Sequence, residues 1–229
     1  MAKIVITGAS SGIGAAIAES FYQDGSHEMI LIGRSESRLE AVANSTKSHP
    51  LICDITDEAW VGSACEEIRE KFQSPPDVLV NNAGHFVAKP FLETTPDLFK
   101  KQIESNLMGC FLVTKNLLPA MITAKSGHVF FMGSVASIKG YAGASAYCAA
   151  KHGLLGLARA VRAETLNTGV RITTILPGAT LTPSWAGTTL PQERFMSPED
   201  VARCIVDVWR LSPRTVVEEL LLRPAEGDI

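Results

Sequence analysis

A tyrosine, a lysine and a serine in the second half of the chain have the types and spacing of a group that transfers protons. Tyr147 and Lys151 stand four residues apart in the run SAYCAAKHG, and Ser134 lies thirteen residues before the tyrosine. Residues four apart on a helix share one face, so the lysine ammonium can lie beside the phenol. A phenol titrates at about pH 10 in water, and a nearby cation favours its phenolate form. The serine hydroxyl could hold a carbonyl oxygen while charge develops on it.

The Tyr-Lys spacing is not specific by itself, because a tyrosine and a lysine at helical spacing occur by chance in many proteins. Proton transfer to a carbonyl oxygen is also only half of a reduction. The other half is a hydride, which a dinucleotide cofactor supplies. The pair therefore has to be weighed together with the rest of the chain.

A glycine-rich turn near the start of the chain supplies the feature that a dinucleotide needs. Residues 7–14 read TGASSGIG and directly follow the aliphatic run KIVIT. Glycines let the backbone approach a pyrophosphate closely, and the start of the next helix adds partial positive charge. Glycines used for packing alone are the competing interpretation. We predict binding of a dinucleotide, with contacts from Gly8, Ser10, Ser11, Gly12, Ile13 and Gly14.

The end of the second expected strand indicates which dinucleotide is bound. NAD sites place an acid there, about 20 residues past the glycine turn, to bind the ribose 2′-hydroxyl. This chain has Gly33 and Arg34 at that point, followed by Ser35, and no acid before Glu36. An arginine and hydroxyls suit a 2′-phosphate. The pattern favours NADP(H) over NAD(H), although Arg34 could instead be a solvated residue ahead of a helix.

Short aliphatic runs alternate with longer helical patterns along the whole chain. The expected strands are 3–7, 28–33, 50–54, 77–81, 128–133, 171–176 and 218–223. The expected helices are 12–24, 36–44, 57–72, 96–124, 145–167 and 198–210. Most strand runs are almost continuously apolar, as in strands covered on both faces. The alternation predicts a single α/β domain over residues 1–229, with a Rossmann-type doubly wound parallel sheet of about seven strands and helices on both faces.

The bulk composition narrows the class of protein. The chain has 229 residues, is 46% hydrophobic and carries a net charge of −3, without the basic excess that favours nucleic acid. Five cysteines without a CxxC pair, and five scattered histidines, indicate neither a disulfide framework nor a metal site. We find no signal peptide pattern and no uninterrupted apolar stretch of the ~20 residues that a membrane span needs. We therefore expect a cytoplasmic protein without a membrane or nucleic-acid partner.

In their order along the chain, the motifs resemble the short-chain dehydrogenase/reductase family, of the NADP(H)-preferring type. Each motif is modest alone, but their joint occurrence in this order is specific and covers essentially the whole chain. The matching pieces are TGASSGIG (7–14), Asp54 in CDITD, NNAG (81–84), Asn106 in SNLMG, Ser134, Tyr147 with Lys151, and PG (177–178) followed by Thr180 and Thr182. The resemblance implies hydride transfer between a nicotinamide and a carbonyl or secondary alcohol.

The resemblance also implies a role for each matching residue. Tyr147 would donate the proton, Ser134 would orient the substrate oxygen, and Lys151 would hold the nicotinamide ribose and favour the phenolate. Asn106 would support a water that links Lys151 to solvent. The other cofactor contacts would come from Asp54 and Ile55 near the adenine, Asn82, Ala83 and Gly84 beside the adenosine ribose, and Pro177, Gly178, Thr180, Leu181 and Thr182 around the nicotinamide.

Three of these residues also have structural interpretations that the sequence leaves open. Asn82 could chiefly tie strands together. Asp54 could serve only as a cap at the end of a strand. Asn106 could make a purely structural hydrogen bond within its helix.

The substrate site is expected to be small and mostly apolar. Residues 183–196 are the only long irregular segment and could form a lid over the active site. A lid of this length is small, so it would cover a bulky or carrier-tethered substrate poorly. The ending VVEELLLRPAEGDI resembles the branch with serine and 3-hydroxy acid dehydrogenases and sepiapterin-type reductases. Fold does not choose the substrate among alcohols, ketones, sugars and acyl groups. The candidate substrate contacts are Ser134, Val135, Ala136, Tyr141, Tyr147, Leu181 and Trp185.

The leading hypothesis is an NADP(H)-dependent reductase or dehydrogenase that acts on a small carbonyl or alcohol. The alternative is a non-catalytic NADP(H)-binding redox sensor, which would be expected to lose the tyrosine or the lysine. Sugar epimerisation would call for a larger substrate domain than residues 183–229 can provide. Apolar residues over much of helices 96–124 and 145–167 predict a homodimer or homotetramer; they include Leu107, Phe111, Leu112, Leu154, Leu155 and Leu157.

Overall fold

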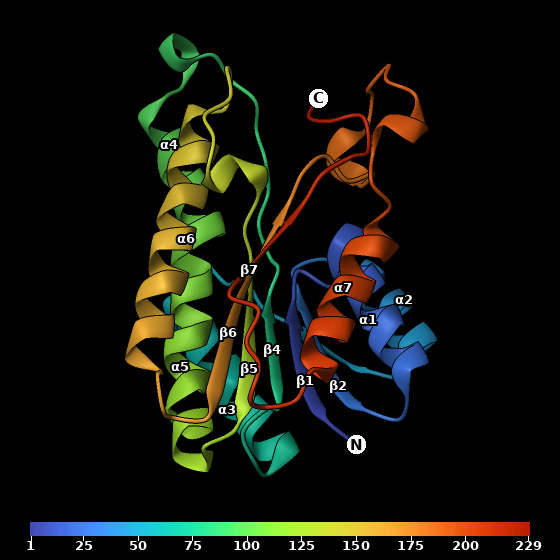
Figure 1. Cartoon of the computed structure of the whole chain (residues 1–229), viewed down its shortest axis with the longest axis vertical. Helices are drawn as coiled ribbons and strands as arrows, with labels where there is room; N and C mark the ends of the chain where they lie inside the picture. The colour runs from blue at the N-terminus through green and yellow to red at the C-terminus, as the bar shows by residue number, and fades with distance from the viewer.

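Seven short strands lie side by side in the order β3-β2-β1-β4-β5-β6-β7, and every neighbouring pair is parallel. The computed structural model describes all residues from 1 to 229, with helices on both faces of this sheet (Figure 1). The strands are β1 (Lys3–Thr7), β2 (Glu28–Gly33), β3 (His49–Ile52), β4 (Val78–Asn81), β5 (Gly127–Met132), β6 (Val170–Pro177) and β7 (Glu219–Leu222). The helices are α1 (Gly12–Asp24), α2 (Glu36–Thr46), α3 (Glu58–Phe72), α4 (Pro96–Ile103), α5 (Gly109–Ala124), α6 (Ser145–Glu164) and α7 (Pro198–Arg210).

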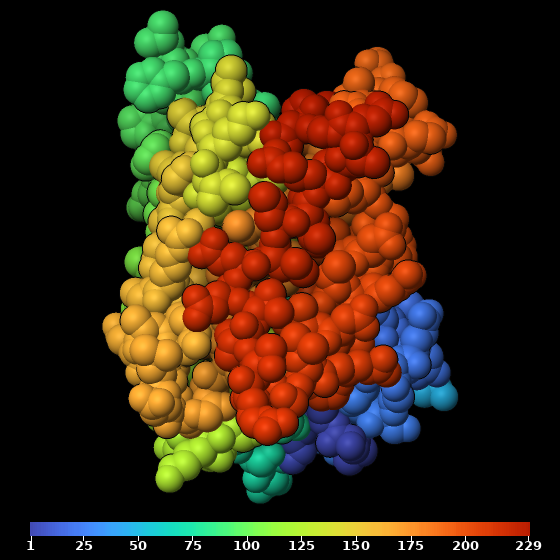
Figure 2. Space-filling model, viewed as in Figure 1, coloured from blue at the N-terminus to red at the C-terminus, as the bar shows by residue number.

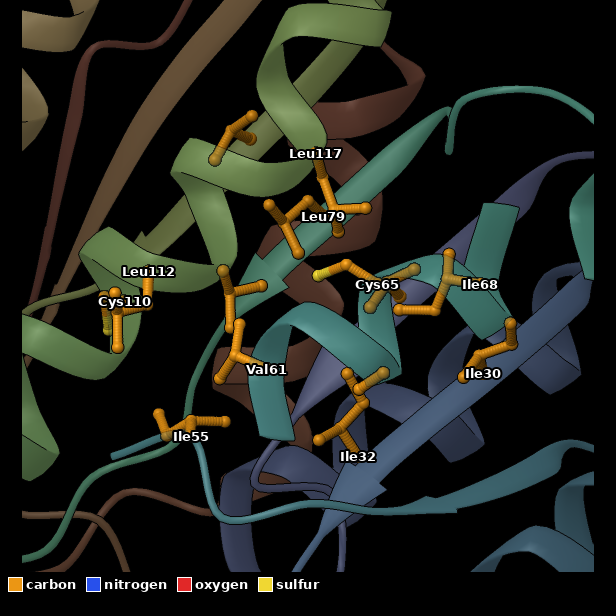
Figure 3. Packing of buried hydrophobic residues seen from close by; sticks show 14 of the residues in the cluster. Ile30, Ile32, Ile55, Val61, Cys65, Ile68, Leu79, Cys110, Leu112 and Leu117 are labelled. Carbon is orange, nitrogen blue, oxygen red and sulfur yellow. The ribbon is translucent and has the colours of Figure 1, made fainter. Parts of the chain in front are cut away.

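The continuous apolar runs are explained by burial on both faces of the sheet. Successive side chains of a strand point to opposite faces, so each strand supplies two cores. In β1, Ile4 and Ile6 join the core beneath α1, α2 and α7, whereas Val5 joins the core beneath α3, α5 and α6. Figure 3 shows part of the second core, where Leu79 of β4 lies among Leu117, Cys65 and Val61. The doubly wound sheet predicted from the sequence is confirmed.

The strand order creates the crevice in which the site forms. From β1 the chain builds outward to β2 and β3, and from β4 it builds in the opposite direction to β7. The connection that follows β1 and the connection that follows β4 therefore leave on opposite faces of the sheet. This opens a gap between the carboxyl ends of these two strands. The loops that follow β1, β4, β5 and β6 all leave the sheet at this carboxyl edge (Figure 1).

The predicted helix 96–124 is not continuous. A π-helical turn at Glu104–Met108 separates α4 from α5, and Asn106 lies within it. A π turn inserts one residue into the helical ladder and commonly marks a functional site. The hydrophobic pattern of residues 96–124 resembles that of a single helix, so the sequence did not reveal the break.

Other helices and strands begin or end a few residues away from their predicted bounds. Helix α3 begins one residue late because Asp57 is its cap and accepts a hydrogen bond from the Trp60 amide at 2.9 Å. Thr95 and Ser197 cap α4 and α7 in the same way, as the Thr-Pro and Ser-Pro pairs predict. The predicted strand 50–54 shifts to β3, the predicted strand 218–223 shortens to β7, and the predicted helices 36–44 and 145–167 become α2 and α6. The irregular segment 183–196 contains two single 3₁₀ turns, Pro183–Trp185 and Gln192–Arg194.

Taken together, α4, the π turn and α5 (Pro96–Ala124) are long and apolar enough to cross a membrane by length and composition alone, with a mean hydropathy of 1.4. In this fold Cys110, Val113 and Leu117 pack into the core against the sheet. The helix of a buried core has the same composition as a membrane span, so this packing accounts for much of its apolar character.

Candidate active site

A cleft of about 670 Å³ runs along the carboxyl ends of the strands. It brings together the glycine turn after β1, Arg34 after β2, the NNAG segment after β4, Ser134 after β5 and the start of α6. Every site residue predicted from the sequence lines this cleft except Gly14 and Leu181. Residues from segments far apart in the sequence therefore converge on one site.

Leu181 does not line the cleft, so the structure does not bring it together with the other predicted site residues. Its amide donates a hydrogen bond to the Met196 carbonyl at 2.9 Å, and the residue borders a separate shallow hollow next to α1. Side chains alternate in extended backbone. Thr180 and Thr182 therefore reach the cleft, and the leucine between them does not.

Gly14 has a packing role instead of a lining role. A Cβ atom at this position would lie 2.2 Å from the Gly8 carbonyl oxygen, so no side chain fits between the turn and the helix. Gly8 and Gly12, in contrast, line the cleft and have φ angles of 67° and 55°. These are left-handed conformations that favour glycine. Both interpretations of the glycine pattern thus apply, each to different positions.

The glycine turn presents unpaired backbone donors to the cleft. Ser11 precedes the first residue of α1, and its side chain makes no capping hydrogen bond. The first amides of a helix have no partner within the helix. Because no side chain caps them, and because they lie at the positive end of the helix dipole, the turn fits the pyrophosphate of a dinucleotide.

Lys151 is held inside the cleft by the sheet. Its side chain is only 4% exposed, and Nζ donates a hydrogen bond to the carbonyl of Met132, the last residue of β5, at 2.8 Å. Nζ also lies 5.6 Å from the centre of the Tyr147 ring. The i, i+4 relation predicted from the sequence is confirmed.

Ser134 is fixed by a local turn that leaves its proton available. Its Oγ accepts a hydrogen bond from the Ala136 amide at 3.1 Å, and its own amide donates to Ser137 Oγ at 3.1 Å. These two bonds form a capping box at the start of the 3₁₀ turn Val135–Ser137. Because the oxygen acts as acceptor, the hydroxyl hydrogen is free to be donated to a substrate oxygen.

Asn106 combines a structural and a site role. Its Nδ2 donates to the carbonyls of His85 and Gln102 at 2.9 and 3.1 Å, which ties the π turn to the segment after β4. Its Oδ1 is buried without a partner in the protein. A Cβ on Gly84 would lie 2.5 Å from this oxygen and 3.6 Å from Lys151 Nζ. The free oxygen therefore faces the same small space as the ammonium, where a hydrogen-bonding group such as a water fits both.

Asn82 and Asp54 each hold the local backbone while they line the cleft. Asn82 Nδ2 donates to the carbonyls of Thr7 and Gly8, so it ties the loop after β4 to the end of β1. Asp54 accepts hydrogen bonds from the amide and hydroxyl of Thr56. Burial would raise the pKa of Asp54, but these hydrogen bonds and the charge of Arg34 hold it below its ordinary value. Both structural interpretations left open by the sequence are therefore supported.

Arg34 stands at the edge of the cleft and makes one long, exposed ion pair. Its Nη1 lies 3.4 Å from Asp54 Oδ2, and its side chain is 67% exposed. Such an exposed pair contributes little energy, so the guanidinium is free to turn toward an anion. Arg38, which the sequence motifs did not indicate, lines the cleft on the same side and donates to Ser35 Oγ at 3.0 Å. The i, i+4 spacing of the two arginines could have revealed it.

Two further cleft residues follow the NNAG segment. The Phe86 ring meets the Tyr147 ring edge to face, with centroids 5.0 Å apart. His85 also lines the cleft, and its Nε2 lies 3.0 Å from Gln102 Nε2. Desolvation lowers the pKa of His85, and the charge of Arg34 lowers it further. At neutral pH His85 thus adds no positive charge near the site.

The comparisons with known proteins agree with this geometry. The sepiapterin reductase of Chlorobaculum tepidum is 36% identical over 238 residues, which cover 99% of this chain and 97% of that protein. The structure of an alcohol dehydrogenase from Thermococcus sibiricus, complexed with 5-hydroxy-NADP, has a TM-score of 0.92 at 29% identity and covers 100% of this chain and 99% of that chain. A serine dehydrogenase complexed with NADP+ has a TM-score of 0.89 at 25% identity, with coverage of 99% and 96%. The family model described as short chain dehydrogenase matches residues 2–192. The chain belongs to the short-chain dehydrogenase family.

Proposed function

We propose that this protein is an NADP(H)-dependent reductase that interconverts a carbonyl group and a secondary alcohol. The observation that carries the proposal is the convergence of Ser134, Tyr147 and Lys151 on the cleft that the glycine turn also lines. When bound, NADP(H) supplies or accepts the hydride. Everything else in the reaction falls to residues of this chain.

Four side chains would divide the proton chemistry among them. Ser134 donates a hydrogen bond to the substrate oxygen and fixes its position in the cleft. Tyr147 gives its phenolic proton to that oxygen during reduction, and takes it back during oxidation. Lys151 stabilises the phenolate and contacts the ribose of the cofactor. The free Oδ1 of Asn106 would hold a water next to Lys151, through which the proton is replaced from solvent.

The preference for NADP(H) is supported by the two arginines at the cleft edge and by the NADP-bound relatives. A guanidinium forms bidentate, charge-assisted hydrogen bonds with a phosphate. Arg34→Ala is expected to lower kcat/KM for NADPH about 10- to 100-fold, the range of a lost hydrogen bond to a charged group. The value for NADH should stay within about threefold, because NADH lacks the 2′-phosphate.

Steady-state kinetics with both cofactors measures this difference. Arg214→Ala is a suitable control, since Arg214 is an exposed arginine outside the cleft. Equal losses with NADPH and NADH would mean that Arg34 supports the fold instead of reading the phosphate.

The substrate class that we favour is a ketone on the side chain of a planar heterocycle, such as a pteridine. Support comes from the relative named sepiapterin reductase, and from the aromatic rings of Phe86, Tyr141 and Trp185 along the cleft. Flat apolar rings suit the face of a flat substrate. A screen of NADPH oxidation against pterins, diketones, aldehydes, simple ketones and 3-oxo acids tests the assignment. Turnover of simple ketones with none for pterins would reject this substrate class and keep the reductase.

A non-catalytic redox sensor is the competing function. Such a protein needs the dinucleotide cleft but not the proton-transfer group. Lys151 is buried, although removing its charge from water costs free energy. Because a sensor would not need this buried lysine, its presence favours catalysis. Full binding of NADPH without turnover across the whole screen would favour the sensor instead.

We further propose that two copies of this chain associate through α4 and α5. Leu112, Leu154 and Leu155, which the sequence assigned to such a contact, are buried in the core and cannot take part. Exposed apolar residues in α4 and α5, in the π turn between them and in the turn before α4 could form the contact instead: Phe91, Leu92, Phe99, Met108 and Phe111. Phe91 and Leu92 are 75% and 95% exposed, which is unusual for large apolar side chains.

Sedimentation equilibrium at micromolar concentration should show a dimer or tetramer. Phe111→Glu should shift the protein toward monomer, whereas Leu211→Glu, at an exposed apolar residue after α7, should not. A monomer for the unchanged protein would contradict the proposal. We also propose that the protein is cytoplasmic and has no membrane or nucleic-acid partner. The small net charge and the core packing of α5 support the absence of such partners.

A further inference from the structure

The last residues of the chain return to the cleft. Residues 223–229, here called the tail segment, follow β7 and cross the carboxyl end of the sheet. Figure 2 shows the red tail segment at the upper end of the molecule, between the yellow segment on one side and the orange segment on the other. Asp228 and Ile229 line the same cleft as the proposed catalytic residues. The proposed reaction assigns no role to this segment.

The tail segment is anchored where it leaves the sheet. The Gly178 amide donates to the carbonyl of Leu222, the last residue of β7, at 2.8 Å. A Cβ on Gly178 would lie 3.0 Å from Cδ of Pro224, so the proline packs closely on this glycine. A turn then reverses the chain, with the Gly227 amide donating to the Pro224 carbonyl at 2.9 Å and a Gly227 φ of 87°. The start and direction of the segment are thereby set.

Asp228 fastens the other end of the tail segment to the loop after β5. Its Oδ2 accepts hydrogen bonds from the Tyr141 hydroxyl at 2.7 Å and from Lys139 Nζ at 3.2 Å. Its Oδ1 pairs with Arg223 of the same segment. The side chain is 16% exposed. Hydrogen bonds from Arg223 and Tyr141 lower the pKa of Asp228 to about 2, so the carboxylate is charged throughout the neutral range.

A second fastening reaches the loop after β6. Arg194, from the 3₁₀ turn Gln192–Arg194, pairs with Glu226 Oε2 at 2.8 Å, and its Nη2 lies 3.5 Å from the Asp228 carbonyl oxygen. The tail segment thus connects the loop that carries Tyr141 with the loop that carries Trp185. Three donors already satisfy the Asp228 carboxylate, so its role is to position other groups.

We propose that the tail segment is a wall of the substrate cleft, and that Asp228 is the positioning residue that holds this wall against Tyr141. With the wall in place, the cleft is closed on the side of Asp228 and Ile229, which favours a compact substrate. Releasing the tail segment removes contacts from a small ketone and gives room to a larger one. The selection by size rests on the proposed carbonyl reductase function, whereas the fastening of the wall does not.

Asp228→Asn tests the wall by kinetics. The amide keeps the size of the side chain but loses the charge that Arg223 and Lys139 contact. KM for the smallest accepted ketone should rise about fivefold or more, while kcat stays within about twofold. The ratio of kcat/KM for a bulky ketone over the small one should rise about tenfold. Asp228→Glu should restore part of the selection, because it keeps the charge.

Hydrogen exchange tests the fastening independently of activity. In Asp228→Asn, amides of residues 139–144 and 225–229 should exchange faster than in the unchanged protein, with or without turnover of any carbonyl. Asp207→Asn, which changes an exposed carboxylate on α7 outside the cleft, is the matched control and should alter neither readout. Unchanged exchange, or an equal fall of kcat for all ketones with an unchanged size ratio, would overturn the proposal. If the unchanged protein is inactive but amides exchange faster in the variant, the reductase function is rejected. The proposal that Asp228 fastens the tail segment is then still supported.

Discussion

Tyr147→Phe is expected to lower kcat about 100- to 10,000-fold, because the change removes the only proposed proton donor to the substrate oxygen. The ring itself is retained. Its contacts with Phe86 and with the small apolar cluster of Ala136, Ala144 and Cys148 need no hydroxyl, so the fold and the cleft should persist. No hydrogen bond of the Tyr147 hydroxyl supports another part of the protein. Binding of NADPH should therefore remain within about threefold of the original value.

The measurement combines single-turnover kinetics with a fluorescence titration of NADPH. Tyr22→Phe serves as the matched control, since it removes a tyrosine hydroxyl on α1, outside the cleft. Loss of activity in the control would point to a general effect on stability. Normal turnover in Tyr147→Phe would mean that another group supplies the proton.

Lys151→Met is expected to lower kcat about 100-fold or more and to raise KM for NADPH about tenfold. Methionine has nearly the length of lysine but carries no charge and donates no hydrogen bond. The fall in kcat follows from the loss of a fixed cation beside the phenolate. Removal of one preorganised hydrogen-bond donor from an active site has an effect of similar size. The rise in KM for NADPH follows from the lost contact with the ribose. A change in both parameters separates this residue from Tyr147, which should change kcat alone.

The variant also leaves the Met132 carbonyl without its partner at 2.8 Å, so its thermal stability has to be measured alongside its kinetics. Lys71→Met, at an exposed lysine of α3, controls for the loss of a positive charge. If Lys151→Met kept kcat within about threefold while folded, the ammonium would have no part in the chemistry.

The sequence predicted most of this site because its residues occupy strand ends. Parallel strands that alternate with helices place their carboxyl ends at one edge, so Ser134 after β5 and the NNAG segment after β4 had to meet near the glycine turn. Tyr147 and Lys151 then needed only the helical period to share a face. These inferences use local patterns and one topological rule.

The parts that the sequence did not predict depend on contacts between distant segments. Asp228 and Tyr141 are 87 residues apart, and nothing in RPAEGDI indicates that its aspartate reaches a tyrosine hydroxyl. The π turn around Asn106 is invisible because one inserted residue barely changes a hydrophobic pattern. That Leu181 does not line the cleft could not be predicted, because the direction of a side chain in a loop depends on the register of its backbone with Met196. Each miss concerns geometry that tertiary contacts decide.

The central claim is that this chain moves a hydride to a carbonyl carbon while Tyr147 protonates the oxygen. The most direct test is the mass of the alcohol formed from an accepted ketone with NADPH that carries deuterium on the transferable position of C4. We expect an alcohol with one deuterium on the carbinol carbon for the unchanged protein, and for Tyr147→Phe the same labelled product at a rate lower by about 100-fold or more. An unlabelled alcohol, or equal rates for the two proteins, would contradict this claim.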